Sequence, residues 1–454
     1  MNDTAARPSV PANPLLTAPI LPTLARLAVP NMIALTVQSA VVIAETSYIG
    51  VLGTESLAAM ALVFPMIMLT QQMSSGAMGG GVSSAVARAL GSGDPARARA
   101  LAMHAIVIGI TGGLLFTLFF LTLGPAIYRL LGGQGGVETQ ALAYSNTFFS
   151  GVVVIWLLNT LASIARGTGN MKVPSMTVIA CASLQVVLGG GLGLGLGPFP
   201  RLGIAGVALG QLLSFGAGCV FLSWFLLSGR GRLKLGLAGV SLNHEMFTDI
   251  LKVGAVACLS SLASVMTVII FARLVAGFGT NVLAGYGIGV RLEFLLIPIA
   301  FAIGTACVPM VGMAIGAGDV ARARRVAWTG GCLSAAIIGL IGIGVAIEPD
   351  LWARLFTNSE PVRAAARDYL RWAGPGFPFY GLGLCLYFAS QGAGKMVGPV
   401  FAAMVRLSIV AIGGWWFNRQ GAPASALFAL AGFALMGYGL TTAAAVKISN
   451  WARR

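Results

Sequence analysis

Apolar runs of about twenty residues or more, separated by short polar breaks, recur along almost the whole chain. A helix needs about 20 apolar residues to cross about 30 Å of hydrocarbon. Because backbone groups in lipid must hydrogen-bond within the protein, such runs predict helices and not open sheets. We therefore predict an all-α polytopic membrane protein with twelve transmembrane helices. The expected spans are 25–51, 57–83, 101–123, 138–163, 173–196, 203–228, 248–277, 282–312, 326–347, 366–390, 397–417 and 424–447.

The longest polar break, residues 229–247, divides the spans into two sets of six. Basic and apolar residues are interleaved in this break, which is typical of a helix lying at the membrane surface. We predict an N-lobe of residues 21–228, this cytoplasmic inter-lobe linker, and a C-lobe of residues 248–454. Residues 1–20 are rich in proline and polar side chains, unlike a cleavable signal peptide, and are predicted to be a disordered cytoplasmic tail.

The two sets of spans repeat each other in a constant register. The segment 93–99 (GDPARAR) returns as 318–324 (GDVARAR), and 167–174 (GTGNMKVP) returns as 392–399 (GAGKMVGP). The distance along the chain from Asp94 to Asp319 equals that from Pro174 to Pro399, and we call it the repeat spacing. Two unrelated motifs in the same register indicate a duplicated unit. In a membrane protein, internal repeats predict a transporter whose two pseudo-symmetric halves enclose the substrate path.

Composition agrees with a lipid-covered surface. The chain is 57% hydrophobic and 9% charged, with a mean hydropathy of +0.88, whereas a soluble domain has about 25% charged residues. The net charge of +15 does not indicate a nucleic-acid partner, because the basic residues lie in short loops between spans. All six cysteines fall inside apolar spans, so we interpret them as small hydrophobic residues and expect no metal site.

The distribution of Lys and Arg predicts the orientation, since cytoplasmic loops carry the excess of basic residues. With the N-terminus inside, the even-numbered spans end in the cytoplasm beside most of the basic loop residues. Both termini are therefore predicted to be cytoplasmic in a multi-pass protein of the cell inner (plasma) membrane. The basic residues on that side are Arg88, Arg97, Arg99, Arg166, Lys172, Arg230, Arg232, Lys234, Arg322, Arg324, Arg325, Lys395, Lys447, Arg453 and Arg454.

Only two of the thirteen acidic residues, Glu45 and Glu293, lie well inside predicted spans. A charge at the bilayer centre costs about 2.5–3.5 kcal/mol even on lenient scales. Glu45 lies about 10 Å from the outer end of span 1. A carboxyl held out of water can take up and release a proton near neutral pH, although a structural role is an alternative. The repeat aligns Glu45 with Phe271, so this acid belongs to the first half only.

Two further features of the spans have both a functional and a structural interpretation. Glu293 on span 8 is either a second cation-coupling group or a buried charge that holds this span to a neighbour through Arg291 or Arg406. Pro30 removes an internal hydrogen bond from span 1, which produces either a helix that bends during transport or a static kink. Its repeat partner is Ala255.

Several uncharged polar residues and a methionine-rich stretch on span 2 are candidates for a substrate cavity or polar network. Soft methionine surfaces suit varied apolar ligands, although each of these residues is also explained by packing. The candidates are Gln38, Tyr48, Gln71, Gln72, Met73, Asn159 and Gln185.

Taken together, these motifs resemble the multidrug and toxic compound extrusion (MATE) family. They are the loops 91–99 (GSGDPARAR) and 316–324 (GAGDVARAR) after spans 2 and 8, 166–170 (RGTGN) after span 4, and 390–394 (SQGAG) at span 10. The resemblance covers about residues 20–450. It implies two six-helix lobes around a central cavity, and secondary active export of organic cations or amphiphilic drugs in exchange for protons or sodium.

The resemblance also bears on the coupling ion. Prokaryotic proton-linked members carry an acid where Glu45 stands, whereas the usual Asn and Asp of their span 5 are here Gln185 and Gly189. The acids of the sodium-linked branch on spans 7 and 10 have no counterpart. Since sodium needs several converging oxygens and a proton needs one titratable group, we expect proton coupling through Glu45, with sodium coupling as the alternative and no cofactor.

Two other classes of function are alternatives to a multidrug antiporter. A lipid or glycolipid flippase needs a basic cavity, and interior basic residues are few: Arg273, Arg291 and Arg406. A membrane enzyme needs clustered acids or histidines at membrane depth, and the two histidines lie near span ends, so no enzyme activity is expected. We expect a monomer whose partners are small amphiphilic or cationic substrates and membrane lipids.

Overall fold

The computed structural model describes residues 14–236 and 241–452, which form helices and no strand. Residues 1–13 of the predicted tail and 237–240 of the predicted linker lie outside the described residues. The helices are α1 (Pro14–Thr17), α2 (Ile20–Leu52), α3 (Thr54–Gln71), η1 (Gln72–Met78), α4 (Gly79–Gly91), α5 (Pro95–Leu130), α6 (Gly135–Ser150), α7 (Val152–Gly167), α8 (Lys172–Leu194), α9 (Gly203–Leu227), α10 (His244–Ala276), α11 (Thr280–Gly316), α12 (Val320–Ile347), α13 (Asp350–Ala353), α14 (Glu360–Ala373), η2 (Gly374–Gly376), α15 (Phe377–Ala393), α16 (Val397–Arg419) and α17 (Ala424–Ile448).

The helices confirm an all-α membrane fold. Within the described part of the chain, ten helical segments are long and apolar enough to cross a membrane, and the pair α6–α7, bent by 48°, makes an eleventh. The predicted span 366–390 is not one apolar helix, because η2 interrupts it and its first part, α14, carries several charged residues. The breaks at Gly151 and Gly376 are separated by the repeat spacing, so both lobes interrupt their fourth span at the same place.

The duplicated loop motif forms the same helix cap twice. Asp94 precedes α5 and accepts a hydrogen bond from the backbone N–H of Arg97, and Asp319 precedes α12 and accepts one from that of Arg322; both bonds are 2.8 Å long. A carboxylate at this position satisfies a free N–H of the first turn and interacts favourably with the helix dipole. The repeated sequence therefore encodes a repeated local structure.

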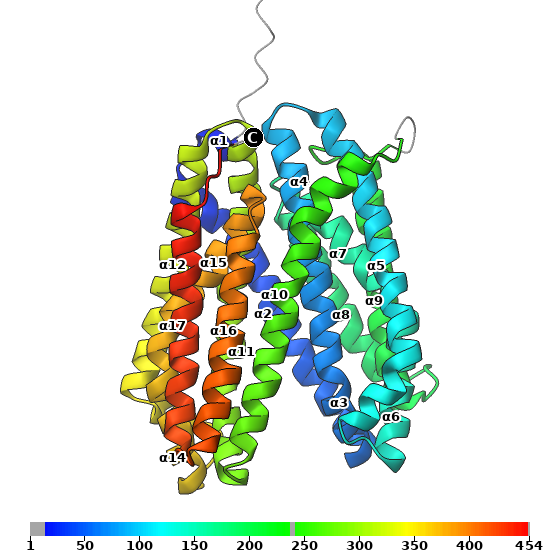
Figure 1. Cartoon of the computed structure of the whole chain (residues 1–454). Helices are drawn as coiled ribbons and strands as arrows, with labels where there is room; N and C mark the ends of the chain where they lie inside the picture. The colour runs from blue at the N-terminus through cyan, green and yellow to red at the C-terminus, as the bar shows by residue number, and fades with distance from the viewer. Residues whose placement is uncertain (1–13, 237–240, 453–454) are drawn as a thin grey trace, which may run out of the picture.

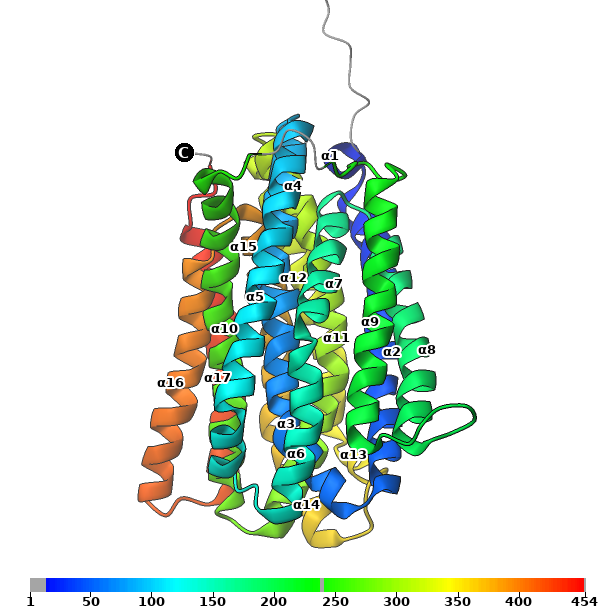
Figure 2. The same ribbon diagram turned by 90° about the vertical axis from the view of Figure 1, so that its right-hand side faces the viewer.

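The helices form two lobes, the N-lobe on the right of Figure 1 and the C-lobe on its left. Helix α1 and the end of the described chain lie at the same end of the molecule in both views (Figures 1 and 2). We call this the terminal end and the opposite one the far end. In Figure 1, α2 runs from the C-lobe side at the terminal end to the N-lobe side at the far end.

Contacts along α2 show that it belongs to both lobes. Its first part places Leu24 and Leu27 in a core cluster with residues of α11, α12 and α15. Asn31, directly after Pro30, donates a hydrogen bond of 2.8 Å to the Thr305 hydroxyl on α11. Farther along, Ile49 is buried in the core of the N-lobe. The helix therefore changes lobes near its proline.

Small residues let the two lobes approach closely at the terminal end. A Cβ atom added to Gly81 on α4 would lie 2.8 Å from the backbone nitrogen of Gly254 on α10, and one added to Gly91 would clash with the carbonyl oxygen of Met313 on α11. Any larger side chain would force these helices apart, as expected where membrane helices pack through glycine. The described structure is thus closed between the lobes at this end.

Ion pairs join the lobes across the same contact. Arg88 on α4 lies 2.7 Å from Asp249 on α10, and Arg97 on α5 lies 3.1 Å from Glu245 and 3.3 Å from Asp249. His104 on α5 accepts a hydrogen bond of 2.8 Å from the backbone N–H of Asn243, just before α10. We call the four charged residues the inter-lobe latch.

Arg322, the repeat partner of Arg97, holds the segment that leads into the lobe-crossing helix α2. Its buried guanidinium donates to the carbonyl oxygen of Leu15 at 3.1 and 3.2 Å and to that of Ala18 at 2.6 Å. Both arginines therefore bind the part of the chain that enters the first span of the opposite half. The segment that Arg322 holds continues directly into α2.

Two predictions about connecting segments are wrong where the structure describes them. Residues Pro14–Thr17 form α1 with Leu15 buried, so this part of the predicted tail is ordered. Residues 229–236 and 241–243 of the linker are not helical, and α10 already begins at His244. In the linker Leu233 and Leu235 are buried against the N-lobe core, which explains the interleaved apolar residues without a surface helix.

Neutralising the acidic side of the latch should open the terminal end. Exposed ion pairs contribute about 0.2–1 kcal/mol each, so Glu245→Gln with Asp249→Asn is expected to increase the open population about tenfold. Pulsed electron paramagnetic resonance between spin labels at Ser228 and Asn450 measures this population. Glu138→Gln, which breaks the 2.6 Å pair with Arg129 inside the N-lobe, should not change it. An unchanged distance distribution in the double variant would contradict a latch.

Candidate functional site

The Glu45 carboxyl lies in the interior of the N-lobe. Glu45 is 6% exposed and accepts a hydrogen bond of 2.6 Å from the Gln185 side-chain amide on α8. Among the described residues, none of its recorded interactions is with a basic side chain. A carboxyl in such surroundings is costly to keep ionised, because neither water nor a cation compensates its charge.

Gln185 suits a partner whose protonation changes. Its amide carries two N–H donors and a carbonyl acceptor. The N–H group donates to the carboxylate, and after rotation of the amide the carbonyl oxygen accepts from the neutral acid. The residue that replaces the Asn of the family pattern can therefore bind Glu45 in either state.

Tyr144 on α6 is a neighbour of Glu45 that the sequence analysis missed. It is 1% exposed, its hydroxyl has no hydrogen-bond partner among the described residues, and an electrostatic interaction links it to Glu45. The available signal was the repeat, since Tyr144 and Tyr369 are separated by the repeat spacing. Each lobe thus has a buried tyrosine at the same repeat position that interacts with the interior acid, through a hydrogen bond in the C-lobe and electrostatically in the N-lobe.

A second polar group in the N-lobe joins two predicted cavity residues. The Asn159 amide on α7 donates to the Gln71 side chain at 3.2 Å and to the Ser74 hydroxyl at 2.8 Å. Ser74 belongs to η1, where the helix of span 2 widens into π-helical turns. Such turns interrupt the regular hydrogen-bond ladder and are frequent at functional sites, which supports Gln71 and Asn159 as site candidates.

In the described part of the chain, the other predicted site residues of the N-lobe make no hydrogen bond to the polar groups described above. The Tyr48 ring lies against α8, where a Cβ added to Gly190 would be 3.2 Å away. Gln38 on α2 and Gln72 on η1 are partly buried and have no recorded hydrogen bond to the groups above. Met73 packs against the N-lobe core, as its packing interpretation predicts.

Glu293 lies in the other lobe and has different surroundings. The Tyr369 hydroxyl on α14 donates a hydrogen bond to it, and Arg406 on α16 supplies an opposite charge. Arg291 instead lies 5.2 Å from the ring centre of Phe356. Of the two basic partners considered from the sequence, the structure therefore favours Arg406.

Aromatic rings lie around both Glu293 and Arg406. The Arg406 guanidinium lies 5.3 Å from the ring centre of Tyr380 on α15. Tyr286 contacts Tyr369 edge to face, with ring centres 5.2 Å apart. The interior acid of the C-lobe thus lies among aromatic rings with a basic side chain in its surroundings, whereas no basic side chain is recorded for Glu45 among the described residues.

Two helical lobes with membrane-depth polar groups, related by an internal duplication, define a polytopic membrane transporter. The family model MatE matches residues 30–189 and 256–416, one segment in each half. The chain belongs to the MATE family of multidrug efflux transporters.

Curated relatives within this family are transport proteins. The chain is 27% identical over 312 residues to an FAD transporter of Shewanella oneidensis, which covers 68% of this chain and 69% of that protein. It is 23% identical over 386 residues to a probable multidrug resistance protein NorM of Thermotoga maritima, covering 85% and 82%.

Solved structures share the whole architecture of twelve transmembrane helices in two lobes. A MOP superfamily transporter from Pyrococcus furiosus, described as having a binding pocket of reverse polarity, superposes with a TM-score of 0.87 at 23% identity and covers 96% of this chain and 98% of its own. An outward-facing MATE family transporter of the same superfamily gives a TM-score of 0.85, with coverage of 96% and 97%.

Removing the Gln185 donor should impair transport. Hydrogen bonds to charged groups contribute about 1.5–3 kcal/mol, so Gln185→Leu is expected to lower the export rate under a fixed pH gradient at least about tenfold. The rate of dye export from proteoliposomes measures the effect. Gln211→Leu, at an equally buried position on α9, is the matched control and should retain most activity. Equal rates in the two variants would remove Gln185 from the site.

Proposed function

We propose that this transporter exports amphiphilic or cationic compounds in exchange for protons, with Glu45 as the coupling group. The observation that carries the proposal is a buried carboxyl that, among the described residues, has no basic partner and lies on the helix that connects the lobes. Loading a proton removes the cost of a charge held out of water. The coupling step is therefore a change in the free energy of α2 itself.

The positions of Pro30 and Glu45 suggest how this change moves the lobes. The part of α2 before Pro30 is fixed to the C-lobe by Leu24, Leu27 and the Arg322 contacts with the preceding segment. The part that bears Glu45 packs in the N-lobe. Proline removes one backbone hydrogen bond, so the helix bends most easily there. Protonation of Glu45 would alter this bend and displace substrate from the N-lobe.

The direction of transport follows from the proposed orientation. In this orientation the protein lies in the inner membrane, and its basic loops and both termini face the cytoplasm. The closed terminal end is then the cytoplasmic one, and protons reach Glu45 from the far, external side. A proton moving inward down its gradient would release substrate outward, as alternating access requires.

The contacts of the two interior acids favour protons over sodium and Glu45 over Glu293. Sodium coordination needs converging oxygens, whereas the bonded partner of Glu45 is an N–H donor that already occupies a carboxylate lone pair. Glu293 accepts a hydrogen bond from Tyr369 and interacts electrostatically with Arg406, so groups on two other helices already engage its carboxyl. We assign Glu293 to holding α11 against α14 and α16.

Glu45→Gln should abolish proton-driven export. The amide keeps the size and hydrogen-bonding capacity of the acid but binds no proton, so it uncouples transport from the gradient. In proteoliposomes with separately imposed proton and sodium gradients, we expect export of a cationic dye to fall at least about a hundredfold. Glu55→Gln, at an exposed position on α3, is the control. Wild-type rates for Glu45→Gln, or export driven by sodium alone, would overturn the assignment.

The C-lobe cluster and one relative favour a second candidate substrate, an aromatic anion such as FAD. The relative from Shewanella oneidensis is an FAD transporter. Arg406 stacked on Tyr380 offers a planar cation and an aromatic face, which suit a phosphate and a flavin ring. A lipid flippase is a weaker candidate function than FAD export. It would need interior basic groups, and Arg291, one of the few on a span, is exposed and lies over the Phe356 ring.

Arg406→Gln distinguishes the two substrate classes. If flavin is carried, export of FAD into the external medium should fall at least about tenfold while export of cationic dye is retained. Fluorescence of both compounds can be followed in the same proteoliposomes. Failure of the wild-type protein to export FAD would leave cationic amphiphiles as the substrate class.

A further inference from the structure

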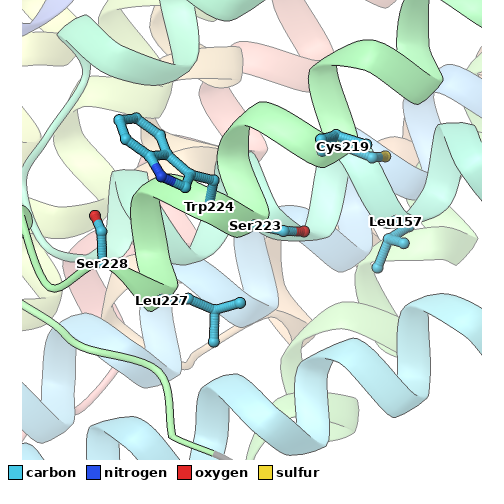
Figure 3. A pocket seen from close by; sticks show the side chains of 7 residues that line it. Leu157, Cys219, Ser223, Trp224, Leu227 and Ser228 are labelled. Atoms are coloured by element: carbon cyan, nitrogen blue, oxygen red, sulfur yellow. The ribbon is translucent and has the colours of Figure 1, made fainter.

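A groove on the outer surface of the N-lobe takes no part in the proposed transport mechanism. It has a volume of about 730 Å³, is open along one side, and lies between α9 and Leu157 of α7. Figure 3 shows its lining, with Leu157 and Cys219 toward one end and Trp224 and Ser228 toward the other. Val220 and Trp224 are 72% and 48% exposed, so the groove faces the lipid surroundings of a membrane protein.

The shape of the groove follows the helix axis. Its lining residues on α9 and at the C-terminal cap of α9 occur in adjacent pairs four residues apart, from Cys219 and Val220 to Leu227 and Ser228. Residues at this spacing lie above one another on one face. With a rise of about 1.5 Å per residue, the stripe is about 12 Å long. An apolar channel of this length along a transmembrane helix suits an extended acyl chain.

Basic residues lie just beyond the terminal end of the groove. The Arg230 guanidinium lies over the Trp224 ring, 4.7 Å from its centre. A guanidinium that lies over an aromatic ring can still donate two N–H groups to one phosphate. Lys234 is also exposed, and residues 229–243 include three basic residues and no acidic one. Trp and Arg at a helix end are typical of the headgroup level of a membrane.

We propose that this groove binds an acidic phospholipid, with one acyl chain along α9 and its phosphate at Arg230. Basic pockets at the cytoplasmic ends of transmembrane helices recognise such headgroups. The apolar lining gives contact with any lipid, and the basic end supplies selectivity for a net negative headgroup. The proposal is independent of the coupling ion and of the exported compound.

Lipid retention measured by native mass spectrometry tests this site. The full-length protein is titrated with phosphatidylglycerol and, separately, phosphatidylcholine. We expect one phosphatidylglycerol to bind at least about tenfold more tightly than phosphatidylcholine. Arg230→Gln should remove this preference and Arg230→Lys should restore part of it. Arg419→Gln is the matched control, because Arg419 also lies over an exposed tryptophan, Trp415 at 5.1 Å, but beside no part of this groove.

Two further measurements test whether the acyl chain of the lipid lies in the groove. Phosphatidylglycerol with brominated chains should quench part of the tryptophan fluorescence, and Trp224→Phe should remove that part. Val220→Trp, which fills the lining, should weaken binding of both lipids. Equal binding of the two lipids by the wild type, or an Arg230→Gln variant with unchanged preference, would overturn the proposal. So would a Val220→Trp variant that loses dye export but retains phosphatidylglycerol, since the groove would then be a substrate portal.

Discussion

The structure depends on one helix, α2, being shared between two bodies. Its terminal half is packed in the C-lobe through Leu24 and Leu27, and its far half is packed in the N-lobe around Ile49. Close-packed interiors resist gradual deformation, so relative motion of the lobes must be absorbed where α2 passes from one to the other. Pro30 lies at that point, and Asn31 makes the hydrogen bond to Thr305 directly after it. Any event that changes the energy of the far half of α2 is therefore transmitted between the lobes.

Residues that recur in both halves form the shared framework of the fold, whereas the residues assigned to coupling occur in one half only. Capping aspartates, the breaks in the fourth span, Tyr144 with Tyr369 and Arg97 with Arg322 all recur at the repeat spacing. Glu45 and Pro30 do not recur. The two arginines show how the same position is used differently: Arg97 pairs with acidic side chains of α10, whereas Arg322 binds backbone carbonyls before α2. A backbone contact needs no particular side chain in the segment that it holds.

The sequence predicts the parts of this protein that local physics determines. Hydrophobic length gives the spans, the repeat gives the two halves, and the cost of a charge in lipid singles out Glu45 and Glu293. The break at η2 was missed because apolar residues continue after it, although the Gly374-Pro375-Gly376 sequence and the charged residues of α14 precede it. The Gln71–Asn159 contact, the choice of Arg406 over Arg291, and the groove on α9 depend on how distant helices pack. No spacing within a single span contains that information.

Under the proposed coupling through Glu45, the magnitudes explain why one proton would be enough to change the state of such a molecule. The latch residues Arg88, Arg97, Glu245 and Asp249 are partly exposed, so water screens their ion pairs and together they contribute on the order of 1–3 kcal/mol. An ionised carboxyl in the bilayer interior costs about 2.5–3.5 kcal/mol. The two terms are similar in size, and a difference of about 1.4 kcal/mol changes an equilibrium tenfold. A stronger latch, built from buried ion pairs, would hold the terminal end closed whatever the protonation of Glu45. Weak, hydrated pairs at the membrane surface would instead let protonation of a single group shift the balance between the two states, as the proposed coupling requires.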